Sequence, residues 1–194
     1  MQPGIITLMA KTRKRVLYAN DATESIPLLL KIRLPWLMIG LALSLGTAAV
    51  VSRYEEILSL NPSVAFFMPL IVYVSDAVGT QTATIYIRNL DKKQAKFKTY
   101  IIKELGLGLC IGAIFGVVTA TVTHFWLKAD DLAVAVGIAL FASITCATVF
   151  ALVLAALLNK LKTDPATGAD PIVTVVQDII SLMIYFWVVS LIVA

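Results

Sequence analysis

Apolar residues fill five long segments of the chain, and polar or basic residues collect in the shorter stretches between them. Each apolar segment is close to the ~20 residues with which a helix crosses ~30 Å of hydrocarbon. The pattern therefore predicts an all-α integral membrane protein with five transmembrane helices. Their expected bounds are about 34–51, 63–87, 105–127, 132–158 and 172 to the C-terminus. Pro35 suits the first turn of the first of these helices.

Composition supports a membrane location, because 59% of the residues are hydrophobic, only 14% are charged and the mean hydropathy is +0.90. A soluble domain of this size could not bury so much apolar surface, so we expect a multi-pass protein of the cell membrane. The net charge of +4 does not indicate nucleic acid as a partner, since the basic residues flank the apolar segments. Cys110 and Cys146 lie within apolar runs and read as packing residues.

Basic residues also predict the orientation in the bilayer. Fourteen of the sixteen Lys and Arg residues fall in the N-terminal region, between 88 and 103, or at 160 and 162. By the positive-inside rule these segments, and hence the N-terminus, are cytoplasmic. Residues 1–31 form a basic N-terminal segment, for which an interfacial amphipathic helix and a disordered tail are about equally supported. Residues 32–194 form the five-helix transport domain.

Small residues recur at helical spacing in the third and fourth segments. Gly108, Gly112 and Gly116 form two consecutive GxxxG repeats. The fourth segment has a small residue at every fourth position, namely Ala135, Ala139, Ser143, Ala147, Ala151 and Ala155. Such stripes let neighbouring backbones approach closely in membranes, so we interpret both as scaffold contacts rather than sites.

Two of the apolar segments carry a carboxylate. In the second segment one helical face is polar, with Tyr73, Asp76, Thr80 and Thr84. The last segment repeats the pattern with Asp170, Thr174, Asp178, Ser181 and Tyr185. An ionised carboxylate at membrane depth is costly unless water, a cation or a polar partner stabilises it. Two such faces favour a permeation path or a catalytic site, whereas a single aspartate could also be held by hydrogen bonds between helices.

The residue types on these faces suit a hard divalent cation. Mg²⁺ prefers oxygen ligands and keeps much of its water, so one or two carboxylates with nearby hydroxyls and carbonyls suffice. No histidine–cysteine constellation points to zinc or copper. The one histidine, His124, we interpret as an interfacial residue. Arg88 lies about 18 Å along the helix from Asp76, which makes it a marker of the cytoplasmic mouth rather than a counter-ion.

Several motifs from 32 onward resemble the transmembrane domain of the MgtE-type magnesium channels, a family related to eukaryotic solute-carrier magnesium transporters. They comprise Arg33-Leu-Pro-Trp-Leu37, Pro69-Leu-Ile, Gly79-Thr-Gln81, Ile87-Arg88, Asp164-Pro-Ala166, Pro171, Val173-Thr174, Gln177-Asp178 and Ile184-Tyr185-Phe186. The family's cytosolic N domain and CBS pair have no counterpart among the 194 residues.

The resemblance implies a homodimeric channel, not an enzyme, whose second and fifth spans line a pore on the two-fold axis. Asp178 would bind hydrated Mg²⁺ together with its mate, and Thr174 would contribute its backbone carbonyl. One departure concerns the second span, where Tyr73, Ser75 and Asp76 replace family glycines and Ala77 replaces an asparagine. Asp76 would therefore add a second cation site or shift selectivity, for example toward Mn²⁺ or Co²⁺.

Three other functions compete with a channel. A secondary carrier on the same scaffold would couple cation movement to H⁺ or Na⁺ through Asp76. An intramembrane aspartyl protease would use Asp76 and Asp178 as a dyad, but the sequence around them lacks a Tyr-Asp or Gly-x-Gly-Asp motif. A purely structural membrane subunit would leave both polar faces without an explanation.

Overall fold

The computed structural model describes residues 24–91, 97–161 and 170–193, and within them the chain consists of helices joined by short turns. The long helices are α1 (Ile26–Ser52), α3 (Met68–Asp91), α4 (Phe97–Leu127), α5 (Asp130–Leu161) and α6 (Asp170–Ile192). A short helix α2 (Glu55–Leu60) and a 3₁₀ helix η1 (Pro62–Phe67) connect α1 to α3. Five helices of the described part are long and apolar enough to cross a membrane, as predicted. The expected N-terminal amphipathic helix lies outside the described residues.

Two helices begin earlier than predicted. α1 starts at Ile26, so Pro27 occupies its first turn and Pro35 lies inside the helix. The prediction that Pro35 lies in the first turn was therefore wrong. α4 starts at Phe97 rather than near 105. Hydropathy detects only the part of a helix that crosses hydrocarbon, whereas these helices continue through the interface with polar and basic residues. The short helix α2 was not predicted.

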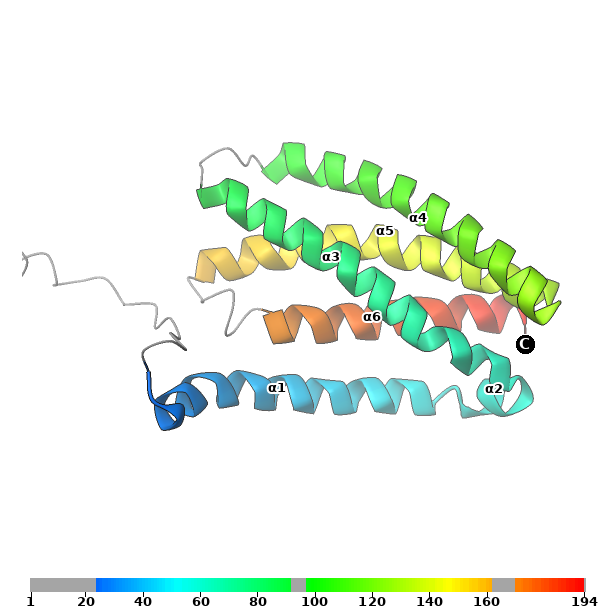
Figure 1. Ribbon diagram of the computed structural model, residues 1–194, viewed down its shortest axis with the longest axis horizontal. Helices are drawn as coiled ribbons and strands as arrows, with labels where there is room; N and C mark the ends of the chain where they lie inside the picture. The colour runs from blue at the N-terminus through cyan, green and yellow to red at the C-terminus, as the bar shows by residue number, and fades with distance from the viewer. Residues whose placement is uncertain (1–23, 92–96, 162–169, 194) are drawn as a thin grey trace, which may run out of the picture.

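Successive long helices run in opposite directions (Figure 1). The start of α1, the helix ends that flank 92–96 and those that flank 162–169 lie at one end of the molecule, on the left of the view. The three basic regions of the sequence therefore adjoin the same end of the bundle. This arrangement agrees with five antiparallel spans. That this end of the bundle faces the cytoplasm stays a prediction.

α5 is the central helix of the bundle and packs against α3, α4 and α6. All six small residues of its predicted stripe are buried. The three glycines of α4 are buried as well, and a Cβ at Gly112 would lie 2.8 Å from the carbonyl oxygen of Phe141. A Cβ at Gly116 would lie 2.6 Å from the carbonyl oxygen of Gly137. Both stripes are scaffold contacts, as predicted. Cys110 and Cys146 are free thiols.

A buried cluster at the other end of the bundle fixes the start of α3. The Tyr185 hydroxyl of α6 donates a hydrogen bond of 2.7 Å to the carbonyl oxygen of Val64 in η1. The ring of Tyr54 stacks on Phe186, with centroids 4.4 Å apart. α1 packs along α6 and otherwise exposes apolar side chains. These contacts set how α3 crosses α6, which positions the two membrane carboxylates.

Candidate cation site

α3 buries one face in the bundle and leaves its predicted polar face at the surface of the protomer. The buried positions recur at helical spacing, namely Ile71, Ser75, Val78, Thr82 and Tyr86. Asp76 and Thr80 are half-buried at the edge of this contact, and Thr84 is exposed. Tyr73 is 74% exposed. The four predicted residues therefore share an outward face, with Asp76 nearest to α6.

The predicted polar face of α6 is divided between the surface and the core. Thr174 and Asp178 are half-buried at the surface of the protomer. Ser181 and Tyr185 are buried, and Tyr185 holds η1 through its hydroxyl. They share the helical face of Asp178, but this part of the face packs in the interior of the bundle instead of lying at the protomer surface. The side chain of Asp170 lies outside the described part.

The two predicted carboxylates come together where α3 crosses α6. Asp76 and Asp178 are close enough to interact electrostatically. One oxygen of Asp178, Oδ1, is buried and has no hydrogen-bond partner within the described residues. Thr174 lies one helical turn before Asp178 on the same side of α6. A protomer thus brings two acidic groups together, and one of their oxygens is buried without a hydrogen-bond partner among the described residues.

Gln177 of α6 contacts α3 at this point, a role that was not predicted from the sequence. Its side chain is 1% exposed, and Nε2 donates to Oδ1 of Asp76 at 3.4 Å. The amide lies directly on Gly79 of α3, where a Cβ would come within 1.7 Å of Gln177 Oε1. Gly79 therefore makes the room that Gln177 needs. The sequence does show an amide next to an aspartate in a membrane helix, which could have indicated a role for Gln177. The direction in which its side chain points, however, depends on how α6 is rotated.

A third buried carboxylate, Glu104 of α4, was also missed. It is 8% exposed and accepts a hydrogen bond of 2.8 Å from the Thr82 hydroxyl of α3. The predicted third span began at 105, which left Glu104 in a loop. Because α4 begins at Phe97, Glu104 instead faces α3 inside the bundle.

The donor set suits a hydrated hard cation. In the part of the chain that the structure describes, no group of three or more His, Cys, Asp or Glu side chains could hold a metal ion. Two carboxylates with amide and hydroxyl oxygens nearby match an ion that retains most of its water. His124 lies away from these carboxylates, at the end of α4. Its side chain is 52% exposed, and its Nδ1 lies 2.6 Å from Oδ1 of Asp130. Its place at a membrane interface stays a prediction.

Comparison with known proteins decides the family. Residues 68–188, more than half of the chain, match the MgtE family, described as a divalent cation transporter. The chain belongs to this family. It is 34% identical over 157 residues to the magnesium transporter MgtE of Bacillus subtilis, covering 79% of this chain and 35% of that protein. For the MgtE of Enterococcus faecalis the identity is 33% over 162 residues, covering 82% and 36%.

The magnesium transporter MgtE of Thermus thermophilus is 27% identical over 162 residues, covering 82% of this chain and 36% of that protein. The chain spans about a third of the length of these relatives. Membership confirms the resemblance read from the motifs, and it makes the chain a multi-pass membrane protein of a transporter family rather than an enzyme. The aspartyl protease hypothesis was therefore wrong.

Gln177 gives the first testable prediction. We expect Gln177→Leu to weaken divalent-cation uptake about tenfold, because a hydrogen bond to a charged group contributes about 1.5–3 kcal/mol. Gly79→Ala should have a similar effect, since the added Cβ displaces the Gln177 amide from Asp76. Uptake into proteoliposomes measures both variants. Gln81→Leu, at an exposed position of α3, is the matched control and should behave like wild type. Full uptake by both Gln177→Leu and Gly79→Ala would contradict this role.

Proposed function

We propose that the protein conducts a hydrated divalent cation, Mg²⁺ in the first place, through a homodimeric pore lined by α3 and α6. The observation that carries this proposal is the meeting of the half-buried Asp76 and Asp178, with one buried oxygen of Asp178 that has no hydrogen-bond partner among the described residues. In a lone protomer this face would meet lipid, which is unfavourable for carboxylates. A second copy related by a two-fold axis would enclose it and bring two Asp178 side chains together.

Selectivity follows from keeping the water shell. Two facing Asp178 carboxylates attract a divalent ion strongly and a monovalent ion weakly. Mg²⁺ dehydrates reluctantly, so the carboxylates and the backbone carbonyl of Thr174 bind the water shell rather than the bare ion. A site that bound bare Mg²⁺ would hold it too tightly for conduction. Entry into the cytoplasm is driven by the membrane potential, which favours a double charge by about 4.6 kcal/mol per 100 mV.

The dimeric pore predicts a cross-link on its axis. After replacement of Cys110 and Cys146 by serine, Tyr73→Cys should form a disulfide-linked dimer in native membranes, because the polar face of α3 meets its own copy. Val117→Cys on α4, which is similarly exposed, serves as the control and should remain monomeric. Gel mobility without reductant measures the linkage. Cross-linking of Val117→Cys in preference to Tyr73→Cys would place the dimer contact on another face.

A coupled carrier is the second candidate, and the proximity of the two carboxylates favours it. Two interacting acids titrate as a pair and can share one proton, which a carrier would exchange for a cation. Proteoliposome flux separates the two functions. A channel gives Mg²⁺ flux that follows the voltage and ignores imposed pH and Na⁺ gradients. Flux driven by a pH or Na⁺ gradient at zero voltage would replace the channel with the carrier.

Asp76 is the residue expected to adjust the choice of ion. Asp76→Gly restores the family's residue, and we expect it to change the ratio of Mg²⁺ to Mn²⁺ or Co²⁺ uptake severalfold while the protein still folds. The reason is that the local negative charge is halved beside Asp178, which alters how strongly each ion is attracted. Competition uptake assays measure the ratio. Asp131→Gly, at the exposed start of α5, is the control, and an unchanged ratio in Asp76→Gly would remove Asp76 from the site.

A further inference from the structure

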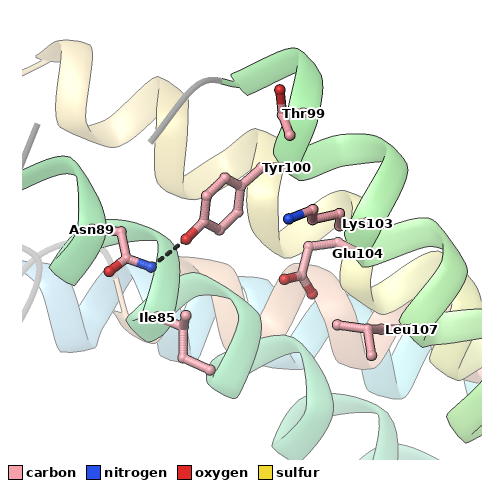
Figure 2. Close-up of a pocket in the computed structure, with 7 residues that line it drawn as sticks. All are labelled: Ile85, Asn89, Thr99, Tyr100, Lys103, Glu104 and Leu107. Atoms are coloured by element: carbon pink, nitrogen blue, oxygen red, sulfur yellow. Dashed lines mark hydrogen bonds between the residues drawn. The ribbon is translucent and has the colours of Figure 1, made fainter. Parts of the chain in front are cut away.

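A cleft of about 440 Å³ lies between α3 and α4, apart from the two aspartates. Its lining residues are Ile85, Asn89, Thr99, Tyr100, Lys103, Glu104 and Leu107. Figure 2 shows the Lys103 nitrogen and the Glu104 carboxylate extending from α4 toward α3. The Asn89 amide donates a hydrogen bond to the Tyr100 hydroxyl across the cleft. Two helices therefore frame an open space with both signs of charge on its walls.

Polarity changes along the cleft in the way that it changes across a bilayer interface. Asn89 and Thr99 lie near the ends of α3 and α4, whereas Ile85 and Leu107 lie deeper. Glu104 is about 10 Å along α4 from Phe97 by helical rise. The headgroup layer on each side of the ~30 Å hydrocarbon core is roughly 5–8 Å thick. In a helix that begins at the membrane surface, Lys103 and Glu104 thus come near the boundary between headgroups and acyl chains, and Leu107 lies about one turn deeper.

The charge on Glu104 lacks a positive partner within the described part of the chain. Its one hydrogen-bond partner there is the Thr82 hydroxyl, and no described Lys or Arg forms an ion pair with it. Lys103 precedes it in sequence and also lines the cleft, but the two side chains form no ion pair. A buried carboxylate without a cation is unfavourable in low dielectric. The cleft therefore provides an unmatched negative group beside a positive one.

We propose that this cleft binds the headgroup of a zwitterionic phospholipid with a primary ammonium group, as in phosphatidylethanolamine. The ammonium donates hydrogen bonds to Glu104, and the phosphate accepts them from Lys103 and the hydroxyls of Thr99 or Tyr100. The acyl chains follow Ile85 and Leu107 into the membrane. Phosphatidylcholine carries the same charges, but its quaternary ammonium has no N–H to donate, so it fits less well.

Other ligands match the walls less well. A divalent cation is repelled by Lys103 and finds a single carboxylate here. An anionic lipid or free phosphate is repelled by Glu104. A ligand that pairs with both Lys103 and Glu104 must carry a negative and a positive charge on adjacent groups.

Native mass spectrometry of the purified protein tests the proposal, with ethanolamine and choline phospholipids of identical acyl chains as probes. We expect wild type to prefer the ethanolamine lipid roughly tenfold, the effect of one charge-assisted hydrogen bond. Glu104→Gln should abolish this preference, and it keeps an oxygen that can accept from Thr82. Glu56→Gln, at an exposed position of α2, is the control and should retain it. Lys103→Gln should weaken both lipids equally, because both carry the phosphate.

Equal binding of the two lipids to wild type, or a preference that survives Glu104→Gln, would overturn the proposal. So would a disulfide dimer of Thr99→Cys in native membranes of a variant without Cys110 and Cys146, since a second copy would then cover the cleft. Gel filtration of each variant shows that it is folded. Because the readout is lipid binding, the result is independent of which ion the protein transports.

Discussion

Asp178→Asn should reduce divalent-cation uptake at least about a hundredfold while the protein still inserts and dimerises. The substitution preserves size and one acceptor oxygen, replaces the other with an NH₂ donor and removes the charge, and in a dimer it removes two charges at once. Each charge-assisted contact with the hydrated ion contributes about 1.5–3 kcal/mol, so the loss of two exceeds a hundredfold in binding. Isotope or dye-reported uptake into proteoliposomes measures the effect.

Asp131→Asn is the matched control for this experiment, because Asp131 is exposed at the start of α5 and far from the carboxylate pair. It should transport as wild type does. A transporter-deficient host that depends on external Mg²⁺ provides a second readout, in which Asp178→Ala should fail to restore growth. Normal growth with Asp178→Ala would rule out the proposed site.

Gly112→Val should have the second large effect, a loss of folded protein. The added side chain enters the contact between α4 and α5, where even a Cβ would lie 2.8 Å from the Phe141 carbonyl oxygen. Because the obstacle is backbone, the helices must separate, and overpacking of this kind costs about 1–3 kcal/mol or more. The loss of close backbone packing adds to this cost, since small residues drive helix association in membranes.

The fraction of monodisperse protein that survives heating in detergent measures this loss. Gly106→Val is a demanding control, because it changes the same residue type on the same helix, and nothing lies within 4 Å of a Cβ at Gly106. It should match wild type within error. Equal thermal survival of Gly112→Val and Gly106→Val would show that the α4–α5 contact is not what stabilises the bundle.

The five membrane helices could be predicted from the sequence, because a bilayer places the same few requirements on every helix that crosses it. Spans longer than the hydrocarbon thickness, basic flanks and small-residue stripes each follow from one helix considered alone. Helix ends were harder to predict from the sequence, because residues such as those at 97–104 continue a helix beyond the hydrocarbon without a long apolar run. Pro35 was assigned to a first turn for the same reason, although α1 continues on its N-terminal side to Ile26.

For the site, a single-helix pattern placed Asp76, Thr174 and Asp178 on polar helical faces but could not relate one helix to another. The proximity of Asp76 and Asp178 depends on how α3 crosses α6, and Gly79 and Gln177 are in contact at this crossing. Ser181 and Tyr185 share the spacing of Asp178, yet they are buried. Their roles depend on the rotation of α6 against α5 and η1, and this information lies in packing rather than in periodicity.

Anomalous diffraction from crystals grown with Mn²⁺, a divalent ion visible by its scattering, is the most direct test of cation binding at the paired aspartates. The account predicts an anomalous peak on a two-fold axis, within water-mediated reach of Asp178 from both subunits. A peak elsewhere, with Asp178 directed to lipid or closed in a dry helix contact, would contradict it.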